Sequence, residues 1–124
     1  MRCLVACTTC KFPDGRKVDD EGVTGGARMI EALRAHLGVQ GRSDITVAEQ
    51  ACLWNCTRSC SVIIRDDQRF SYVTGGHQPT EAQAGAIVAW FDLHGATETG
   101  EVPFRQWPDA IRGHFIARMP PVRP

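Results

Sequence analysis

The chain has 124 residues, 43% of them hydrophobic and 23% charged, which suits one globular domain with a buried core. Fourteen basic residues offset fourteen acidic ones, so no net charge attracts the protein to nucleic acid or to an anionic membrane. The apolar run that follows Arg2 is too short for a signal-peptide core, and no apolar stretch is long enough to span a bilayer. We therefore expect a cytoplasmic protein without nucleic-acid or membrane partners.

The first half of the chain predicts a strand, a helix and a second strand. A short apolar run over residues 2–6 predicts a buried strand that ends at the first cysteine pair. A charged loop over 11–22 follows, and apolar residues then recur at helical spacing over about 24–37. Alternating apolar and polar residues over 44–51 predict a second strand, which leads directly into the second cysteine group.

The second half of the chain predicts a hairpin, a helix and a C-terminal extension. β-Branched and aromatic residues flank a polar turn over 61–73, which favours a hairpin. A helix is expected over 80–94. Residues 98–124 hold most of the prolines, so we predict an irregular tail, with a short helix near 108–113, that packs on a core formed by 1–97.

The order of these elements predicts the fold. A strand, a helix and a strand in succession form a parallel pair by right-handed crossover, and the hairpin adds antiparallel strands to the same sheet. We therefore predict one α/β domain over 1–124 with a thioredoxin-like mixed sheet. Because each cysteine group follows one strand of the parallel pair, both groups are expected at the same end of the sheet.

The six cysteines fall into two groups near positions 3–10 and 52–60. In a reducing cytosol, clustered cysteines more often bind metal or perform redox chemistry than form disulfides. Cys3 lies within the first predicted strand and is expected to be a small core residue. The candidate ligands are four thiols, which belong to Cys7, Cys10, Cys52 and Cys56.

Four converging thiolates suit either an iron–sulfur cluster or a tetrahedral zinc ion. The second pair is C-x₃-C, whereas zinc ribbons usually use two C-x₂-C pairs, and this favours a cluster. A thiol oxidoreductase ranks third, because residues 11–22 separate the first pair from the next helix and no helix dipole would lower a thiol pKa.

Other residues near the cysteines leave their roles open. Trp54 either shields a cluster or only covers the edge of the loop. Lys11 and Arg58 either offset the negative charge of a cluster or are merely solvated. The four histidines are spread over unrelated predicted elements, so no shared metal site is expected among them.

The stretch CLWNCTRSCSVIIRDDQRFSYV resembles the second half of the thioredoxin-like [2Fe-2S] ferredoxins and of the small subunit of respiratory complex I. By that resemblance Cys52 and Cys56 are two ligands, Cys7 is a third, and Cys10 is the nearest match for the fourth. Cys60 falls where those ferredoxins tend to carry a Gly-Pro turn, and this fifth thiol competes with Cys10 as a ligand.

The whole chain resembles a group of bacterial proteins described as predicted metal-binding, which have a CxTC start, a C-x₃-C-x₃-C centre and the ending WPxxxRxxxxARxPP. Here that ending is WPDAIRGHFIARMPP. The resemblances imply a [2Fe-2S] electron carrier without enzymatic activity that exchanges single electrons with redox partner proteins, a reductase or an acceptor enzyme. They also imply a homodimer and a role in cobalamin or metal-cofactor metabolism. The alternative function is a zinc-stabilised binding module without a redox role.

Overall fold

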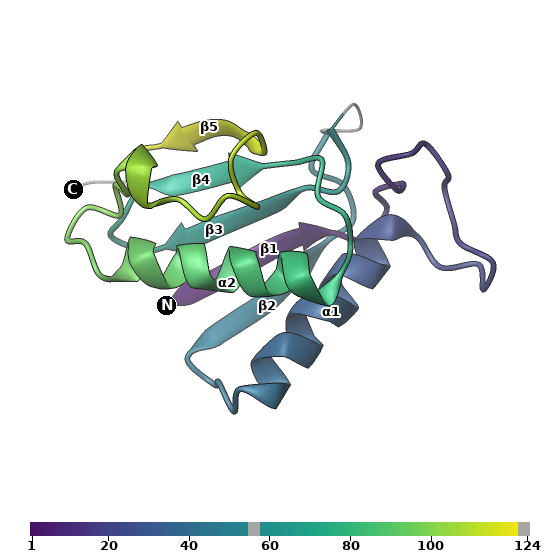
Figure 1. The fold of residues 1–124 in the computed structure, drawn as a ribbon, viewed down its shortest axis with the longest axis horizontal. Coiled ribbons are helices and arrows are strands. Elements are labelled where there is room, and N and C mark those ends of the chain that lie inside the picture. The colour runs from purple at the N-terminus through teal and green to yellow at the C-terminus, as the bar shows by residue number, and fades with distance from the viewer. Residues whose placement is uncertain (55–57, 122–124) are drawn as a thin grey trace.

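A computed structural model describes residues 1–54 and 58–121 of the protein. Within these residues a five-stranded sheet has the strand order β2-β1-β3-β4-β5 (Figure 1). The elements are β1 Arg2–Cys7, α1 Gly25–Val39, β2 Ile45–Gln50, β3 Val62–Asp66, β4 Ser71–Thr74, α2 Glu81–Gly95, a 3₁₀ turn at Phe104–Gln106 and β5 Phe115–Met119.

The sheet is mixed, as the order of elements predicts. Strands β1 and β2 are parallel, with a register that runs from Arg2 opposite Ile45 to Cys7 opposite Gln50. Helix α1 connects these two strands. Strand β3 is antiparallel to β1, and β4 is antiparallel to β3. The predicted crossover and hairpin are therefore confirmed.

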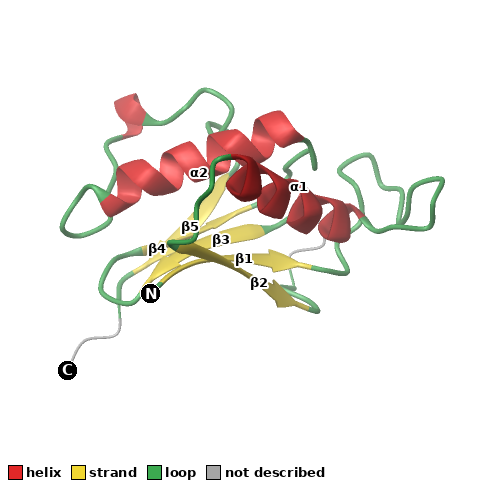
Figure 2. Ribbon diagram, turned by 90° about the horizontal axis from the view of Figure 1, so that it is seen from below, coloured by secondary structure: helices red, strands yellow, loops and turns green. Residues whose placement is uncertain are grey.

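Both helices lie on the same side of the sheet (Figure 2), and the core fills the space between the two layers. On the strands, Leu4, Ile64 and Tyr72 face the helices and are almost fully buried. From α2, Trp90 meets Tyr72 edge to face, with ring centroids 5.1 Å apart. Burial of each such large side chain contributes roughly 1.5–3 kcal/mol to stability, so this layer holds the fold together.

Each helix begins at a threonine that caps its first turn. The hydroxyl of Thr24 accepts a hydrogen bond from the Ala27 N–H at 3.1 Å, and that of Thr80 accepts one from the Gln83 N–H at 3.1 Å. Such caps satisfy backbone donors that have no partner within the helix, and each is worth about 1 kcal/mol. The predicted helical spacing is confirmed in α1, whose core-facing apolar residues are Met29, Ile30, Leu33 and Leu37.

The prediction of an irregular C-terminal tail is wrong for one segment. Residues 115–119 form β5, which pairs antiparallel with β4 and forms one edge of the sheet. The predicted short helix is also absent, because residues 109–113 form consecutive tight turns instead. A five-residue edge strand between proline-rich flanks is too short to give a clear period of two, which explains the error.

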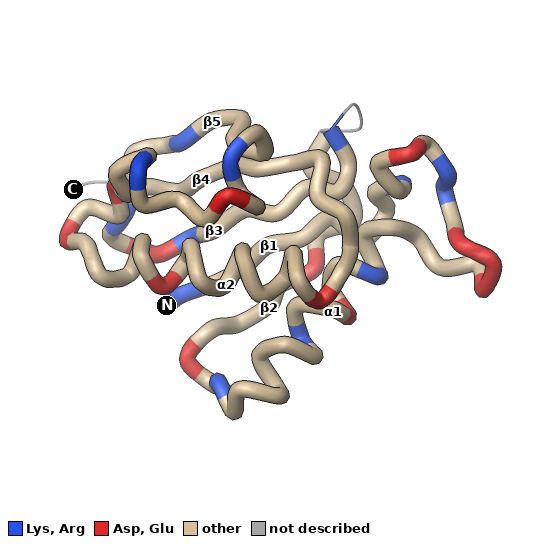
Figure 3. Tube along the Cα trace, in the orientation of Figure 1, with Lys and Arg blue, Asp and Glu red and all other residues tan. Residues whose placement is uncertain are grey.

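Charged residues of both signs are spread over the molecule (Figure 3). Many of them pair: Arg28 contacts Asp19 at 2.7 Å and Glu21 at 3.0 Å, and Arg42 contacts Asp92 at 2.8 Å. In the part of the chain that the structure describes, no helix is sufficiently long and apolar to cross a membrane.

Candidate functional site

The two cysteine groups leave the sheet side by side. Cys7 is the last residue of β1 and lies opposite Gln50, the last residue of β2. The N–H of Thr8 donates to the Gln50 carbonyl at 2.8 Å, so the two chains remain paired one residue beyond the sheet. The segment that begins at Cys7 and the segment that begins at Ala51 therefore meet at one end of the sheet (Figure 1).

Three of the predicted ligands line one cavity of about 510 Å³ at this end of the sheet. Cys7 and Cys10 are buried at its base, whereas Cys52 is exposed. Lys11 and Lys17 also line it, so the cavity carries positive charge. The fourth predicted ligand, Cys56, lies outside the described residues.

Hydrogen bonds converge on the sulfur of Cys7. Burial alone would raise the pKa of this thiol, but hydrogen bonds from the Cys10 thiol and from the backbone N–H groups of Leu53 and Thr9, together with the contact to the Thr9 hydroxyl, outweigh burial. The pKa of Cys7 therefore lies below its ordinary value. The distance between Cys7 Sγ and Thr9 Oγ1 is 3.6 Å. This sulfur is prepared to carry negative charge, as a thiolate ligand must.

The sulfur of Cys10 has donors from the other cysteine group. Burial raises the pKa of Cys10 to about 11, and its thiol donates to Cys7, while the Ser61 N–H and the Ser59 hydroxyl favour the thiolate. A bound cation would reverse the effect of burial, because metal coordination deprotonates thiols. The first and second cysteine groups are therefore already in contact through this sulfur.

The other two cysteines have different surroundings. Cys60 is fully buried, and burial together with the neighbouring Cys10 and Cys7 raises its pKa to about 12. Its thiol donates to the Lys11 carbonyl at 3.6 Å. Cys3 is not in the core between sheet and helices as predicted, because it is half-buried on the opposite face of the sheet. Side chains alternate along a strand, and its neighbour Leu4 occupies the inward position.

The start of α1 packs directly on the first cysteine group. The N–H of Gly26 donates to the Cys10 carbonyl at 2.9 Å. A Cβ atom at Gly26 would lie only 1.8 Å from the Cys7 carbonyl oxygen, and one at Gly25 would lie 2.8 Å from the Lys11 carbonyl oxygen. Only glycine allows so close an approach of helix and loop.

This packing corrects one step of the sequence argument. Residues 11–22 were expected to separate the first cysteine pair from the helix, but the loop folds back and forms a bridge between Val18 and Thr24. The hydroxyl of Thr24 then donates to the Thr8 carbonyl at 2.6 Å. Sequence separation therefore hid a contact in space, although the Gly26 N–H binds a carbonyl rather than a thiol.

The second cysteine group is open to solvent at its start. Trp54 is 92% exposed, so it does not cover the cavity that it borders. Its backbone lies in the left-handed region at φ 57°, and its N–H donates to Cys52 Sγ at 3.3 Å. A ligand sulfur that accepts a backbone N–H is typical of iron–sulfur sites, where such bonds tune the potential.

The donor set at this cavity fits a thiolate-bound group. Among residues 1–54 and 58–121, no three His, Cys, Asp or Glu side chains are arranged to hold a metal ion. Cys7 and Cys10 form a ready pair, and Cys52 borders the same cavity from an exposed position.

Two histidines expected on unrelated elements are in contact. His77 and His114 stack with ring centroids 4.7 Å apart. The Nε2 atom of His77 lies 2.8 Å from the Thr74 hydroxyl, which itself donates to the Val62 carbonyl. His77 Nε2–H is therefore the donor. Its Nδ1 accepts from the Gln83 amide at 2.8 Å, so the ring is neutral, which agrees with burial lowering its pKa to about 3. The contacts of these two histidines are with other protein groups, which indicates a structural role.

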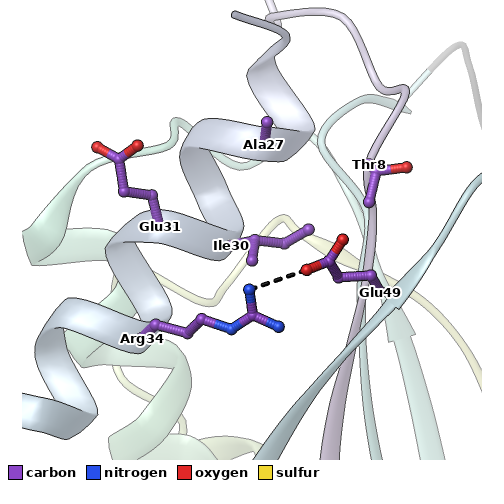
Figure 4. Close-up of a pocket in the computed structure, with 6 residues that line it drawn as sticks. All are labelled: Thr8, Ala27, Ile30, Glu31, Arg34 and Glu49. Carbon is purple, nitrogen blue, oxygen red and sulfur yellow. Dashed lines mark hydrogen bonds and ion pairs between the residues drawn. The ribbon is translucent and has the colours of Figure 1, made fainter.

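A second cavity lies between α1 and β2 and differs in chemistry. Its volume is about 430 Å³, and an ion pair of 2.8 Å between Arg34 and Glu49 crosses it (Figure 4). Both side chains are half exposed, so the pair contributes at most about 1 kcal/mol. No cysteine lines this cavity, so it offers no thiolate ligand.

Several residues of the site were not identified from the sequence. Thr9, Ser59 and Ser61 bond the candidate sulfurs, and Gly26 supports the loop. Hydroxyls and backbone donors have no sequence spacing that distinguishes them. The adjacent glycines at the predicted start of α1 are the one signal that could have indicated a close backbone approach.

The fold has solved counterparts. A thioredoxin-like [2Fe-2S] ferredoxin from Aquifex aeolicus superposes with a TM-score of 0.57 at 15% sequence identity, covering 98% of this chain and 94% of that chain. A variant of the thioredoxin-like [2Fe-2S] ferredoxin from the same organism, with serine in place of one cysteine, gives a TM-score of 0.56 at 13% identity, covering 94% and 99%. The protein is therefore an α/β protein of the thioredoxin-like fold.

Its family is also defined. The family DUF1636, described as a protein of unknown function, matches residues 4–121, so the chain belongs to that family. No curated protein sequence matches the chain.

Proposed function

We propose that this protein is a [2Fe-2S] ferredoxin-like electron carrier that passes single electrons between a reductase and an acceptor enzyme. One observation carries the proposal: three thiols from two distant segments line one cavity, in a fold shared with a thioredoxin-like [2Fe-2S] ferredoxin. Cys7, Cys10, Cys52 and Cys56 would hold the cluster. When bound, the cluster supplies the reversible one-electron chemistry.

The protein's own part is to stabilise charge on the sulfurs. Donors to Cys7 and Cys10 favour the thiolates, and the same bonds favour the reduced state, which carries more negative charge. Lys11 and Lys17 add positive charge at the cavity wall. The exposed edge at Trp54 leaves the cavity accessible to a partner protein.

Burial favours Cys10 over Cys60 as the fourth ligand. Cys10 lines the cavity together with Cys7 and Cys52. Cys60 is fully buried, and its thiol donates to the Lys11 carbonyl beside Cys10. We therefore assign Cys60 a supporting role, in which its S–H stabilises the first cysteine loop by binding the Lys11 carbonyl.

The wider setting belongs to the same proposal. We infer a single domain over 1–124 that works as a cytoplasmic homodimer, without nucleic-acid or membrane partners and without catalytic activity of its own. The resemblance of the full chain to bacterial metal-binding proteins supports service in cobalamin or metal-cofactor metabolism. The competing function is a zinc-stabilised binding module, since four thiolates also suit zinc.

Colour and electron paramagnetic resonance (EPR) separate the two functions. Protein purified without air is expected to be red-brown and to contain two iron atoms and two inorganic sulfides per chain. After one-electron reduction it should give an EPR signal from one unpaired spin per cluster. A colourless preparation with one zinc per chain would contradict the electron carrier and support the binding module.

A further inference from the structure

The C-terminal extension contacts the end of the second cysteine loop through Arg58. This guanidinium donates from Nη2 to the Gly113 carbonyl at 2.8 Å and from Nη1 to the Phe115 carbonyl at 3.3 Å. In these two contacts the guanidinium binds backbone carbonyls rather than a carboxylate. A planar guanidinium can hold two carbonyls at once, which a lysine ammonium does less well.

The backbone of Arg58 and Cys60 is anchored to the segment that follows β4. The N–H of Gly76 donates to the Arg58 carbonyl at 2.7 Å, and the N–H of His77 donates to the Cys60 carbonyl at 3.3 Å. Residues 58–60 are therefore held from two directions, by residues 76–77 through backbone bonds and by the extension through the guanidinium.

The extension itself is attached to the same segment. The N–H of Gly75 donates to the His114 carbonyl at 2.9 Å, and His114 Nδ1 lies 2.9 Å from the Gly75 carbonyl oxygen. The His114 ring stacks on buried His77. Gln83 donates to both His77 Nδ1 and the Ala110 carbonyl, at 2.8 and 2.9 Å. These bonds give the extension a fixed position from which to hold Arg58.

The residues that follow Arg58 contact a candidate ligand, Cys10. The Ser59 hydroxyl and the Ser61 N–H both bond the sulfur of Cys10. A shift of residues 58–61 would change these two bonds together. Residues that orient ligands in this way commonly affect metal affinity about 10- to 100-fold when they are removed.

We propose that the C-terminal extension braces residues 58–61, which end the second cysteine group, through Arg58, and that Arg58 is a positioning residue that sets the hydrogen bonding to the Cys10 sulfur. The inference rests on the proposed electron-carrier function. It gives the extension a role at the metal centre, beyond that of an additional strand at the sheet edge.

Two substitutions from opposite sides of the contact test the brace. Arg58→Lys keeps the charge but loses the two-carbonyl contact. His114→Ala removes a contact that attaches the extension, and it changes no residue of the second cysteine group. Arg112→Lys is the matched control, because Arg112 bonds the carbonyls of Phe104 and Arg105 within the extension. The measurements on full-length protein purified without air are the reduction potential, the EPR spectrum and the rate of colour loss to a chelator.

We expect Arg58→Lys and His114→Ala to lower the reduction potential and to alter the EPR spectrum in the same way. Colour loss should be about 10-fold faster in both variants and unchanged in Arg112→Lys. The double variant should differ little from either single variant, since both break one contact. Unchanged potential and spectrum in Arg58→Lys, with a normal wild-type cluster, would overturn the brace alone. A wild type without a cluster would overturn the proposed function first.

Discussion

The two cysteine loops that meet at the cavity are built in different ways. In the first, residues 7–12, both cysteines are buried, and the loop lies against the start of α1, where Gly26 lets the helix contact the loop backbone. The second begins with the exposed residues Cys52 and Trp54 and is anchored at its far end, near Arg58. The two cysteine groups therefore differ in the burial of the thiols that line the cavity.

This difference suits the proposed cluster, which must enter the site and then remain bound there. For the proposed cluster, the buried pair Cys7 and Cys10 would be ligands already in position, which lowers the conformational entropy lost on binding. An exposed loop gives access, and segments with few buried contacts open at a low free-energy cost. The end of that loop is then positioned by contacts far away in sequence, which reach it from residues 113–115.

Substitution of the ligands has the largest expected effect. Serine at Cys7, Cys10, Cys52 or Cys56 should abolish the colour of the protein, because a hydroxyl is a poor replacement for a soft thiolate. Cys60→Ser should retain the colour, since that thiol bonds a backbone carbonyl. Visible absorbance and iron content per chain measure the outcome. Loss of colour in Cys60→Ser together with retention in Cys10→Ser would exchange the two assignments.

The first cysteine loop is tested at the start of α1. In Gly26→Ala the new methyl would overlap the Cys7 carbonyl, so the loop or the helix must shift. We expect the free energy of unfolding to fall by about 1–3 kcal/mol, with loss of colour as well. Chemical denaturation followed by circular dichroism measures the change.

Gly38→Ala in the same helix is the control for that experiment. A Cβ at Gly38 meets open space, and alanine favours a helix by up to about 1 kcal/mol over glycine. This variant should therefore be as stable as the wild type or more stable. Equal behaviour of Gly26→Ala and Gly38→Ala would show that the close approach of α1 to the first loop is not needed.

Acid should weaken the anchor of the second loop. Burial lowers the pKa of His77 to about 3, against about 6.5 in an unfolded chain. Between these values the unfolded state takes up a proton that the folded state does not, so stability is lost as the pH falls below about 6.5. One such residue contributes a slope of at most about 1.4 kcal/mol per pH unit.

A second buried histidine, His94, serves as a comparison that separates a local effect on residues 58–61 from an effect on overall stability. Burial also lowers the pKa of His94, which lies at the C-terminal end of α2, with Nε2 2.7 Å from the Phe70 carbonyl oxygen. Both His77→Gln and His94→Gln should flatten the dependence of unfolding free energy on pH between about 5 and 7. Only His77→Gln should speed amide hydrogen exchange in residues 58–61. Faster exchange there in His94→Gln as well would remove the special role of His77.

The sequence predicted much of what positions the first cysteine loop and little of what positions the second. Period and capping patterns located β1, α1 and β2, and the parallel crossover then brought Cys7 and Cys52 to the same end. Those patterns are local, so each can be recognised within a single segment of the sequence. The contact of Arg58 with Gly113 and Phe115 uses backbone carbonyls, which every residue has, and no pattern of residue types marks it. Strand β5 was missed for the related reason that its pairing partner, rather than its own composition, defines it.

Trp54 gives the smallest expected effect and the clearest contrast with the core. Its indole is 92% exposed, so Trp54→Ala should change the free energy of unfolding by less than about 0.5 kcal/mol. Trp90→Ala, by comparison, should lower it by about 3–5 kcal/mol, because Trp90 is fully buried against Tyr72. Colour should be retained in Trp54→Ala, since its contact with Cys52 comes from the backbone N–H. A large loss of stability in Trp54→Ala would mean that the second loop packs its indole inward, and the two loops would then be equally fixed.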